Sequence, residues 1–502
     1  MVSIMGGKLK WYLLAVIFVV VLGARLFFAF STPYLNSDDS YFHFRQAEHI
    51  SKTGLPLTSD PLSAGGKEII QSPLFDYVLA IGFALPHALK ILPNILAALL
   101  IIPVFLIVLW LTKNTPISLL FAFLSGFVPI FFTKTFNHLT PLALSLPLLF
   151  FTVYAFLRVP KKSWAITYLI LLILLTVLHS TIFIFIFGLV IYLIFARLGN
   201  VKIHKAETEL ILFSIFFVLW TQFVLYKKLI LFHGPAVIWQ NIPTELLSTH
   251  FAKLTIFTTI WQVGLATLIV GVYAIYMHLF REKSKEVYVL FGMIASVTIL
   301  LWFHLVEFIG GLMFLGVVLL LLASKGFVGF VKFLRQTKLA KLKHLIIIFV
   351  VLIFFFTSCF PTISGAMQEL EQAISEEEML ALKWLNENTP EFSTVVAFWD
   401  EGNLITAIAK RKNILDSYFF LQADASERLS DIKRIYTTQF QTEAVQLMDK
   451  YDASYIYFTP NVQGLFQKET LAYVEPPCFE LVYSDSVKIF RKDRECHVKV
   501  VE

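Results

Sequence analysis

The chain is 502 residues long; 57% of its residues are hydrophobic and only 15% are charged. Soluble globular proteins average about 45–50% apolar and about 25% charged residues. With a mean hydropathy of +0.74, these values exclude a disordered protein, a coiled coil and an ordinary soluble enzyme, and they indicate a multi-pass membrane protein. The net charge of +6 does not indicate nucleic acid as a partner, because most cations before residue 360 lie in short loops between apolar runs.

Apolar runs that can cross a bilayer follow one another through the first 360 residues. A transmembrane helix needs about 20 apolar residues. The first run follows Lys8 and Lys10 and is too long for a signal-peptide core, so we expect an uncleaved anchor with a cytoplasmic N-terminus. We predict about eleven spans, at residues 11–30, 91–112, 117–132, 142–157, 164–178, 180–196, 208–225, 257–280, 287–303, 308–324 and 344–360.

The loop cations predict the orientation of these spans. Lys and Arg residues cluster around 158–162, 197–205, 281–285 and 325–343, all in loops on the same predicted side as the N-terminus. This distribution agrees with the positive-inside rule. An odd number of spans then places the C-terminal region on the extracytoplasmic side of a cell membrane or of the endoplasmic reticulum.

Charge and hydropathy divide the chain into two predicted parts. Residues 1–360 form the α-helical membrane domain, with long outer loops at 31–90 and 226–256. Residues 361–502 have the charge density of a soluble protein and are expected to form an extracytoplasmic mixed α/β domain. The segment 72–89 is apolar but short and contains Pro86, so we interpret it as an interfacial or re-entrant helix.

The first outer loop carries two adjacent carboxylates, Asp38 and Asp39, shortly after the first predicted span. If Asp38 caps a helix, then Asp39, His43 and Gln46 share one helix face. Carboxylate and imidazole groups together can bind a divalent metal or act as a general base. The alternative is that these residues only cap and solvate an interfacial helix.

The C-terminal domain is expected to begin with an amphipathic helix over 368–388. A buried strand, the polar aromatic turn Phe398–Gly402 and a further helix follow it. A turn at the carboxyl end of a strand is where α/β domains place ligand contacts. The alternative is a tight turn in which Trp399 packs into the core.

Two short strands are predicted near the C-terminus, at 454–458 and 481–490. Cys478 and Cys496 flank the second of these segments and could form a disulfide on the outer side of the membrane. The sequence alone leaves open whether they pair or remain free thiols.

Taken together, these segments resemble the catalytic subunit of oligosaccharyltransferases, in the GT-C glycosyltransferase superfamily. Asp39-Ser-Tyr41-Phe-His43-Phe-Arg45 is similar to the family's Asp-Pro-Tyr-Tyr-His-Leu-Arg pattern, and Phe398-Trp399-Asp400-Glu401-Gly402 is similar to its Trp-Trp-Asp-Tyr-Gly signature. Gln71-Ser-Pro73-Leu-Phe-Asp76-Tyr77 and Tyr451-Asp-Ala-Ser-Tyr455-Ile-Tyr457 resemble two further family segments. The order of the motifs, the long first outer loop and the outer C-terminal domain also resemble the family.

The resemblance implies an enzyme that moves a glycan from a polyprenyl phosphate or pyrophosphate carrier to the asparagine of an Asn-X-Ser/Thr sequence. It implies a catalytic, metal-binding role for Asp39, with Asp38 beside it as a further catalytic candidate, and acceptor binding by the Trp399, Asp400, Glu401 and Gly402 turn. The implied cofactor is Mn²⁺ or Mg²⁺. The implied partners are the lipid bilayer, a polyprenyl-linked glycan donor and an acceptor polypeptide, and we expect a single-subunit enzyme.

The sequence departs from the family at the predicted metal site. The second outer loop of the family carries metal-binding carboxylates, whereas Thr133–Pro141 contains none. We therefore assign the metal to Asp39, His138 and Glu245, of which Glu245 lies in the later outer loop. Lys134, His43 and Arg45 are the candidates for binding the donor, and Glu401 stands where the family has tyrosine.

These departures keep two alternatives open. One is a metal-independent GT-C transferase that uses a single outer-loop aspartate as general base and acts on a hydroxyl acceptor. The other is a membrane protein that binds a glycolipid or an Asn-X-Ser/Thr sequence and has lost catalytic activity. A transporter is disfavoured, because almost no charges lie within the predicted spans.

Overall fold

The computed structural model describes residues 8–85, 87–234, 256–419 and 421–497. Its contacts divide the chain into two compact units. The first, here called the helical unit, comprises Met1–Pro33, Leu85–Lys227 and Thr244–Glu371; the second, called the sheet unit, comprises Tyr34–Ala84, Lys228–Pro243 and Gln372–Glu502. The first predicted outer loop therefore folds with the C-terminal residues.

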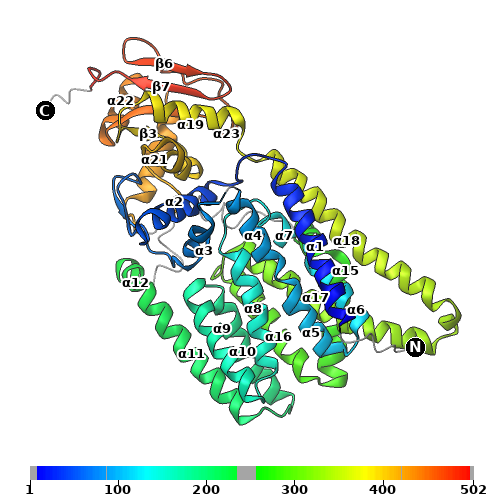
Figure 1. Cartoon of the computed structure of the whole chain (residues 1–502). Helices are drawn as coiled ribbons and strands as arrows, with labels where there is room; N and C mark the ends of the chain where they lie inside the picture. The colour runs from blue at the N-terminus through cyan, green and yellow to red at the C-terminus, as the bar shows by residue number, and fades with distance from the viewer. Residues whose placement is uncertain (1–7, 86, 235–255, 420, 498–502) are drawn as a thin grey trace. The chain divides into compact units, whose positions relative to one another are not determined.

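The helical unit consists of helices, coloured from blue through green to yellow along the chain in Figure 1. Its helices are α1 (Leu9–Ala29), α4 (Ala88–Ala98), α5 (Ile101–Thr112), α6 (Thr115–Ser125), α7 (Pro129–Thr133), α8 (Leu142–Leu157), α9 (Lys162–Leu178), α10 (Ile182–Leu198), α11 (Lys205–Leu225), α14 (Ile256–Val263), α15 (Leu265–Met277), α16 (Lys285–Trp302), α17 (Phe308–Gln336) and α18 (Lys343–Glu371).

By length and composition, six helical stretches of the described residues could cross a membrane: Leu9–Ala29, Ala88–Thr112, Lys205–Leu225, Lys285–Trp302, Phe308–Gln336 and Lys338–Asn388. A seventh candidate is the pair Phe257–Val263 and Leu265–Phe280, which is bent by 86°. Four shorter apolar helices lie at 115–125, 142–157, 162–178 and 182–198. The prediction of eleven spans and its sidedness remain predictions.

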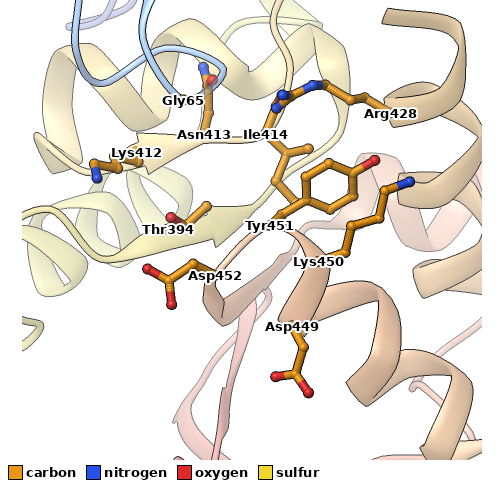
Figure 2. A pocket seen from close by; sticks show the side chains of 10 residues that line it. All are labelled: Gly65, Thr394, Lys412, Asn413, Ile414, Arg428, Asp449, Lys450, Tyr451 and Asp452. Carbon is orange, nitrogen blue, oxygen red and sulfur yellow. The ribbon is translucent and has the colours of Figure 1, made fainter. Parts of the chain in front are cut away.

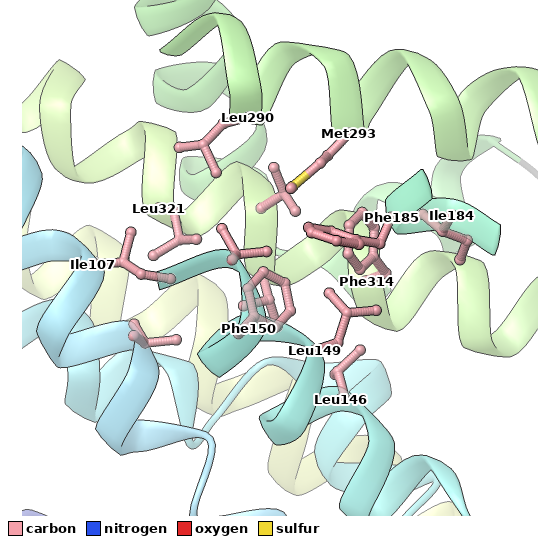
Figure 3. Close-up of a cluster of buried hydrophobic side chains, with 14 of the residues drawn as sticks. Ile107, Leu146, Leu149, Phe150, Ile184, Phe185, Leu290, Met293, Phe314 and Leu321 are labelled. Carbon is pink, nitrogen blue, oxygen red and sulfur yellow. The ribbon is translucent and has the colours of Figure 1, made fainter. Parts of the chain in front are cut away.

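The core of the helical unit is a continuous cluster of buried aliphatic and aromatic side chains, part of which Figure 3 shows. Phe150 and Phe314 stack there, with ring centroids 5.4 Å apart. Helices α10 and α16 approach closely because glycines face each other, and a Cβ on Gly292 would lie 2.5 Å from the Gly188 carbonyl oxygen. Small residues at helix contacts of this kind are typical of membrane proteins.

The sheet unit is a mixed α/β structure. Its elements are α2 (Asp38–Thr53), β1 (Ser59–Asp60), β2 (Lys67–Glu68), α3 (Leu74–Gly82), α19 (Glu376–Asn388), β3 (Thr394–Val396), α20 (Gly402–Leu404), β4 (Lys412–Asn413), α21 (Ala425–Thr437), α22 (Gln441–Lys450), β5 (Ala453–Phe458), α23 (Pro460–Phe466), β6 (Phe479–Ser484) and β7 (Lys488–Lys492). The short helix α12 (Lys227–His233) begins at the last residue of the helical unit's second segment.

The sheet of this unit has five strands in the order β4-β3-β5-β7-β6. Strand β3 is parallel to β4 and β5, whereas β7 is antiparallel to both β5 and β6. The mixed α/β character predicted for the C-terminal residues is therefore present. Residues 34–84 add α2, α3 and the hairpin of β1 and β2 to this unit.

The structure corrects two predicted elements. The helix expected over 368–388 is interrupted, since α18 ends at Glu371 and α19 starts at Glu376. Ser375 begins α19 with a capping box, in which its side chain accepts from the Glu378 amide and the Glu378 carboxylate accepts from the Ser375 amide. Such a cap fixes a helix start independently of the periodicity around it.

The second correction concerns 481–490, expected as one strand. This segment contains a turn between β6 and β7, which pair antiparallel. Strand β5 agrees with the strand predicted at 454–458. Cys478 and Cys496, left open by the sequence, form a disulfide.

Candidate functional site

The two adjacent carboxylates of the first loop lie at the N-terminus of α2. The helix begins at Asp38, and Ser37 rather than Asp38 is its cap residue. The positive end of the helix dipole favours carboxylates in this first turn. Asp38 is buried, whereas Asp39 is exposed, so the two side chains have different environments although they are neighbours.

Residues 365 to 378 positions further along the chain bind both carboxylates. Asp38 accepts hydrogen bonds from the Leu404 amide at 2.9 Å and from the Asn403 side chain at 2.6 Å. The same Asn403 amide donates to the Ser417 hydroxyl at 3.0 Å, and that hydroxyl donates to Asp39 at 2.6 Å. A hydrogen-bond chain therefore runs from the buried Asp38 to the exposed Asp39.

Burial raises the pKa of Asp38 well above its ordinary value, and the negative charge of Asp39 raises it further, while the bonds from Leu404 and Asn403 act in the opposite direction. A carboxyl group held in this way favours its protonated form. Asp39 is the exposed member of the pair, so it is the carboxylate that a bound molecule can reach.

A second set of contacts fixes the segment that carries Ser417. Asp416 is buried and pairs with Lys67, accepts from the Ser63 hydroxyl, and accepts from the Tyr418 amide at 2.9 Å. The rings of Phe42 and Tyr418 stack with their centroids 3.8 Å apart. The first loop and the segment around Ser417 are thus held together on both sides of the Ser417–Asp39 bond.

His43 and Arg45, predicted to bind the donor, are engaged in ion pairs within the sheet unit. His43 is buried, and its Nδ1 lies 2.6 Å from the Asp76 carboxylate of α3. Arg45 makes a bidentate pair with Asp60, in which the Nη2 distance is 2.7 Å. Both contacts tie α2 to the rest of the unit, and the donor role of these two residues remains a prediction.

The predicted acceptor-binding turn follows the carboxyl end of β3. Trp399–Glu401 form one turn of 3-10 helix, and α20 starts at Gly402. Only glycine fits there, because a Cβ on Gly402 would lie 2.3 Å from the Leu415 carbonyl oxygen. Asn403, which binds Asp38, comes directly after this glycine. The turn and the catalytic candidates are therefore joined by hydrogen bonds within one unit.

The two carboxylates of the turn are incompletely bonded. Glu401 is buried and accepts from the Thr459 hydroxyl at 2.5 Å, and Asp400 lies 3.5 Å from the Asn461 side-chain amide. Within the described part of the chain, Asp400 Oδ1 and Glu401 Oε2 are buried without a hydrogen-bond partner. Burial raises the pKa of both groups, and Trp399, partly exposed, lies beside them.

The predicted second outer-loop residues form a separate cluster in the helical unit. Lys134 follows α7, and its ammonium group pairs with Glu369 near the end of α18. His138 Nε2 lies 3.2 Å from the other oxygen of the same Glu369 carboxylate. Glu369 therefore supplies a carboxylate to a loop whose own sequence contains none.

The three predicted metal ligands are distributed over the two units and the residues outside the described ranges. Asp39 belongs to the sheet unit and His138 to the helical unit, and Glu245 lies outside the described residues. Among residues that the structure describes, no three His, Cys, Asp or Glu side chains form a group that could hold a metal ion. The donor set within either unit does not complete a metal site, and a metal ligated by the three predicted residues remains a prediction.

A cavity of about 260 Å³ lies elsewhere in the sheet unit (Figure 2). It is lined by residues at the amino ends of β3 and β4 and by the turn before β5, among them Thr394, Lys412 and Asp452. Since Trp399 follows the opposite, carboxyl end of β3, this cavity is not part of the candidate site.

Sequence reasoning missed the residues that hold the candidates in place. Ser417 and Asn403 lie beyond the recognisable turn motif, and Glu369 lies in an acidic helical stretch where no motif distinguishes it. Asn413 and Asp416 lie shortly after the turn in the sequence, and this proximity indicates that they could contact it. For Glu369 the sequence contains no comparable signal.

The fold is that of the GT-C glycosyltransferases, which confirms the resemblance at the level of structure. The crystal structure of the oligosaccharyltransferase of Archaeoglobus fulgidus in its apo form matches with a TM-score of 0.65, at 15% identity, over 91% of this chain and 70% of that one. The complex of the same organism's AglB with an inhibitory peptide and a dolichol-phosphate matches with a TM-score of 0.63, at 14% identity, over 88% and 69%.

ArnT from Cupriavidus metallidurans matches with a TM-score of 0.56 at 9% identity, over 97% of this chain and 98% of that one. At these identities the likeness concerns the fold, and the sequence is divergent. No protein-family profile and no curated protein matches the chain.

Proposed function

We propose that the chain is a membrane glycosyltransferase that transfers a glycan from a polyprenyl phosphate or pyrophosphate carrier to the asparagine of an Asn-X-Ser/Thr sequence. The observation that carries the proposal is the hydrogen-bonded link from exposed Asp39 through Ser417 and Asn403 to the Trp399–Gly402 turn. This link supports the proposal because it fixes Asp39 relative to the Trp399–Gly402 turn within one compact unit.

In the proposed reaction, Asp39 accepts a hydrogen bond from the acceptor amide and takes up the proton that this nitrogen loses. The nitrogen forms a bond to the anomeric carbon while the bond from that carbon to the carrier phosphate oxygen breaks. The carrier phosphate leaves with the bonding electron pair. The Ser417 hydroxyl, bonded to the other side of Asp39, orients the carboxylate without competing for the acceptor.

The turn would bind the acceptor side chain two positions after the asparagine. Asp400 is only partly buried, so its carboxylate would accept a hydrogen bond from the hydroxyl group of that side chain, and the partly exposed Trp399 would offer an apolar face to its methyl group. Glu401 is too buried to touch this ligand directly, so its effect on the acceptor would pass through Asp400.

The orientation belongs to the same proposal. A disulfide between Cys478 and Cys496 forms and persists in oxidising compartments. It supports an extracytoplasmic C-terminal region, as the loop cations predict.

A metal-independent transferase with a hydroxyl acceptor is the second candidate. It is favoured by the sequence of the predicted second outer loop, Thr133–Pro141, which contains no carboxylate; the fold match to ArnT covers nearly the whole of both chains. Both candidates use Asp39, but only the first needs the Asn-X-Thr acceptor.

The test uses the full chain in detergent with a crude lipid-linked oligosaccharide extract and a labelled Asn-X-Thr peptide. Glycosylated peptide is measured with Mn²⁺, with EDTA, and for the variants Asp39→Asn and Asp452→Asn. Asp452 is the matched control, since it is exposed and makes no side-chain hydrogen bond in the described structure. We expect product from the wild type and from Asp452→Asn, and a loss of at least about a hundredfold for Asp39→Asn.

The outcomes separate the candidates. Loss of product with EDTA would establish a metal requirement, whereas activity in EDTA would support the metal-independent chemistry. If the peptide stays unmodified while a known oligosaccharyltransferase modifies it in the same extract, the Asn-X-Ser/Thr acceptor is wrong. Transfer to hydroxyl acceptors would then distinguish the second candidate from a protein that only binds.

A further inference from the structure

A buried cation lies within α1, the first helix that could span a membrane. Arg25 of α1 is only 1% exposed. Its Nε donates to Asn94 Oδ1 of α4 at 3.0 Å, and its Nη2 donates to the Thr135 hydroxyl. Both partners are neutral, and no carboxylate of the described residues pairs with it. A buried charge without a counter-charge is costly, and ionisable groups inside membrane helices generally mark functional sites.

The bonds of Arg25 converge on the short connection between α7 and α8. Thr135 is fully buried, and its hydroxyl also bonds to the Phe131 carbonyl. Asn94, the other partner of Arg25, donates to the Phe136 carbonyl at 2.6 Å. Arg25 and Asn94 together therefore fix the backbone at positions 135 and 136 against α1 and α4.

The same connection is held from a second helix. Glu369 of α18 pairs with Lys134 and His138, which immediately flank the residues bound through Arg25 and Asn94. Arg25 and Lys134 thus bring two cationic side chains to this connection, and Glu369 pairs with only one of them, Lys134. The network carries one positive charge in excess among these side chains, and in a low-dielectric environment that excess favours an anion nearby.

We infer that Arg25 is a positioning residue that fixes residues 134–138 so that Lys134 and His138 meet the phosphate of a lipid-linked donor. The inference rests on the proposed function for the identity of the donor, but its chemistry is that of any phosphate bound at this connection. Arg25 itself remains covered and acts through Thr135, Asn94 and the excess charge. The alternative is that Arg25 only joins α1 to α4.

Binding is measured without turnover, as the shift in melting temperature of the full chain in detergent over a series of polyprenyl phosphate concentrations. The dephosphorylated polyprenol and inorganic phosphate are the comparison ligands, which separate the lipid from the free anion. The variants are Arg25→Gln, Arg25→Lys and Thr135→Val. The control is Arg158→Gln, which removes a cation that contacts aromatic rings elsewhere in the helical unit.

We expect Arg25→Gln to weaken polyprenyl phosphate binding roughly tenfold or more, as for the loss of a charge-assisted contact. Arg25→Lys keeps the positive charge, so its affinity for polyprenyl phosphate should fall less. Thr135→Val keeps the charge of Arg25 but removes the hydroxyl that Arg25 binds, so its affinity should lie between those of Arg25→Lys and Arg25→Gln. Polyprenol binding should be the same in all variants, and Arg158→Gln should bind as the wild type does. In turnover, KM for the lipid donor should rise while KM for the peptide stays within about twofold.

The inference is overturned if Arg25→Gln binds polyprenyl phosphate as tightly as the wild type does. It is also overturned if Arg25→Gln lowers the melting temperature and weakens the binding of polyprenyl phosphate and of polyprenol by the same factor. If Arg25→Gln does not fold, Arg25→Lys and Thr135→Val decide by the same criteria. Phosphate binding that depends on Arg25, in a chain that glycosylates no peptide, would refute the proposed reaction and leave this inference intact.

Discussion

Ser417 donates a hydrogen bond to Asp39 at 2.6 Å, although the two residues are 378 positions apart in the chain. The bond joins the start of α2 to the segment after β4, and Asn403 links the same hydroxyl to the buried Asp38. A small hydroxyl group therefore connects the exposed carboxylate to the turn that is proposed to bind the acceptor. The position of Asp39 therefore depends on residues from two segments of the sheet unit that are far apart in the sequence, Tyr34–Ala84 and Gln372–Glu502.

Replacing Ser417 by alanine should reduce transfer without unfolding the protein. Loss of a hydrogen bond to a charged group is worth about 1.5–3 kcal/mol, so we expect kcat/KM to fall by roughly one to two orders of magnitude. Ser430→Ala is the matched control, because Ser430 is exposed on α21. Wild-type kinetics for Ser417→Ala would contradict a role of this hydroxyl in orienting Asp39.

The close approach of Gly402 to Leu415 makes a second prediction. Gly402→Ala places a methyl group 2.3 Å from the Leu415 carbonyl oxygen and 2.6 Å from Asp416 Cβ. Overpacking of this kind costs about 1–3 kcal/mol, and any relief must move Asp416 and the neighbouring Ser417. We expect a lower melting temperature and a higher KM for the acceptor peptide.

Gly464 of α23 is the control for this substitution, because a Cβ there meets nothing within 4 Å. Gly464→Ala should leave the melting temperature unchanged or raise it slightly, since alanine restricts the unfolded chain. If the two substitutions changed the melting temperature equally, the close packing around Gly402 would not be the cause of the change.

The predictable parts of the fold and site were those with local signals. Hydropathy located the apolar helices, the pattern at Ser454–Phe458 located β5, and the motif resemblance selected Asp39 and Asp400. Each of these signals occupies a short stretch of sequence. The local pattern failed where a cap or a turn interrupted it, as at Ser375 and within 481–490.

The parts that escaped prediction depend on contacts over long separations. Lys67 pairs with Asp416 across 349 positions, and Lys134 pairs with Glu369 across 235. In a single sequence, nothing distinguishes these partners from other Lys, Asp and Glu residues. For the same reason the sequence indicates no role for Arg25 beyond its place in an apolar span, since its partners Asn94 and Thr135 lie far along the chain.

The buried Glu401 predicts a pH dependence of stability. Burial, followed by the charge of Asp400, raises the pKa of Glu401 well above its ordinary value of 4.5. The other acidic groups that act on it are Glu378 of α19 and Asp38 of α2, and only the hydrogen bond from Thr459 opposes them. Tyr436 of α21 and Tyr457 of β5 also face this carboxyl group.

Since its folded pKa exceeds its unfolded pKa, Glu401 binds a proton more tightly in the folded chain. The free energy of unfolding should therefore fall as the pH rises from about 4.5 through the folded pKa. Glu401→Gln cannot ionise and keeps an oxygen for Thr459, so its melting temperature should exceed that of the wild type by an amount that grows with pH. The melting temperature of Glu469→Gln, at an exposed position, should follow that of the wild type at every pH. A difference in melting temperature between Glu401→Gln and the wild type that does not change with pH would contradict a raised pKa of Glu401.

The disulfide between Cys478 and Cys496 predicts both stability and orientation. Closing a loop of 18 residues should stabilise the sheet unit by about 2–4 kcal/mol, so Cys478→Ser should lower the melting temperature. Dithiothreitol should have the same effect on the wild type and no further effect on Cys478→Ser. In intact cells the bond should be found oxidised by mass spectrometry, because only the extracytoplasmic side favours it. Free thiols at both positions in protein from freshly alkylated cells would instead place this end of the chain in the cytoplasm and reverse the predicted orientation.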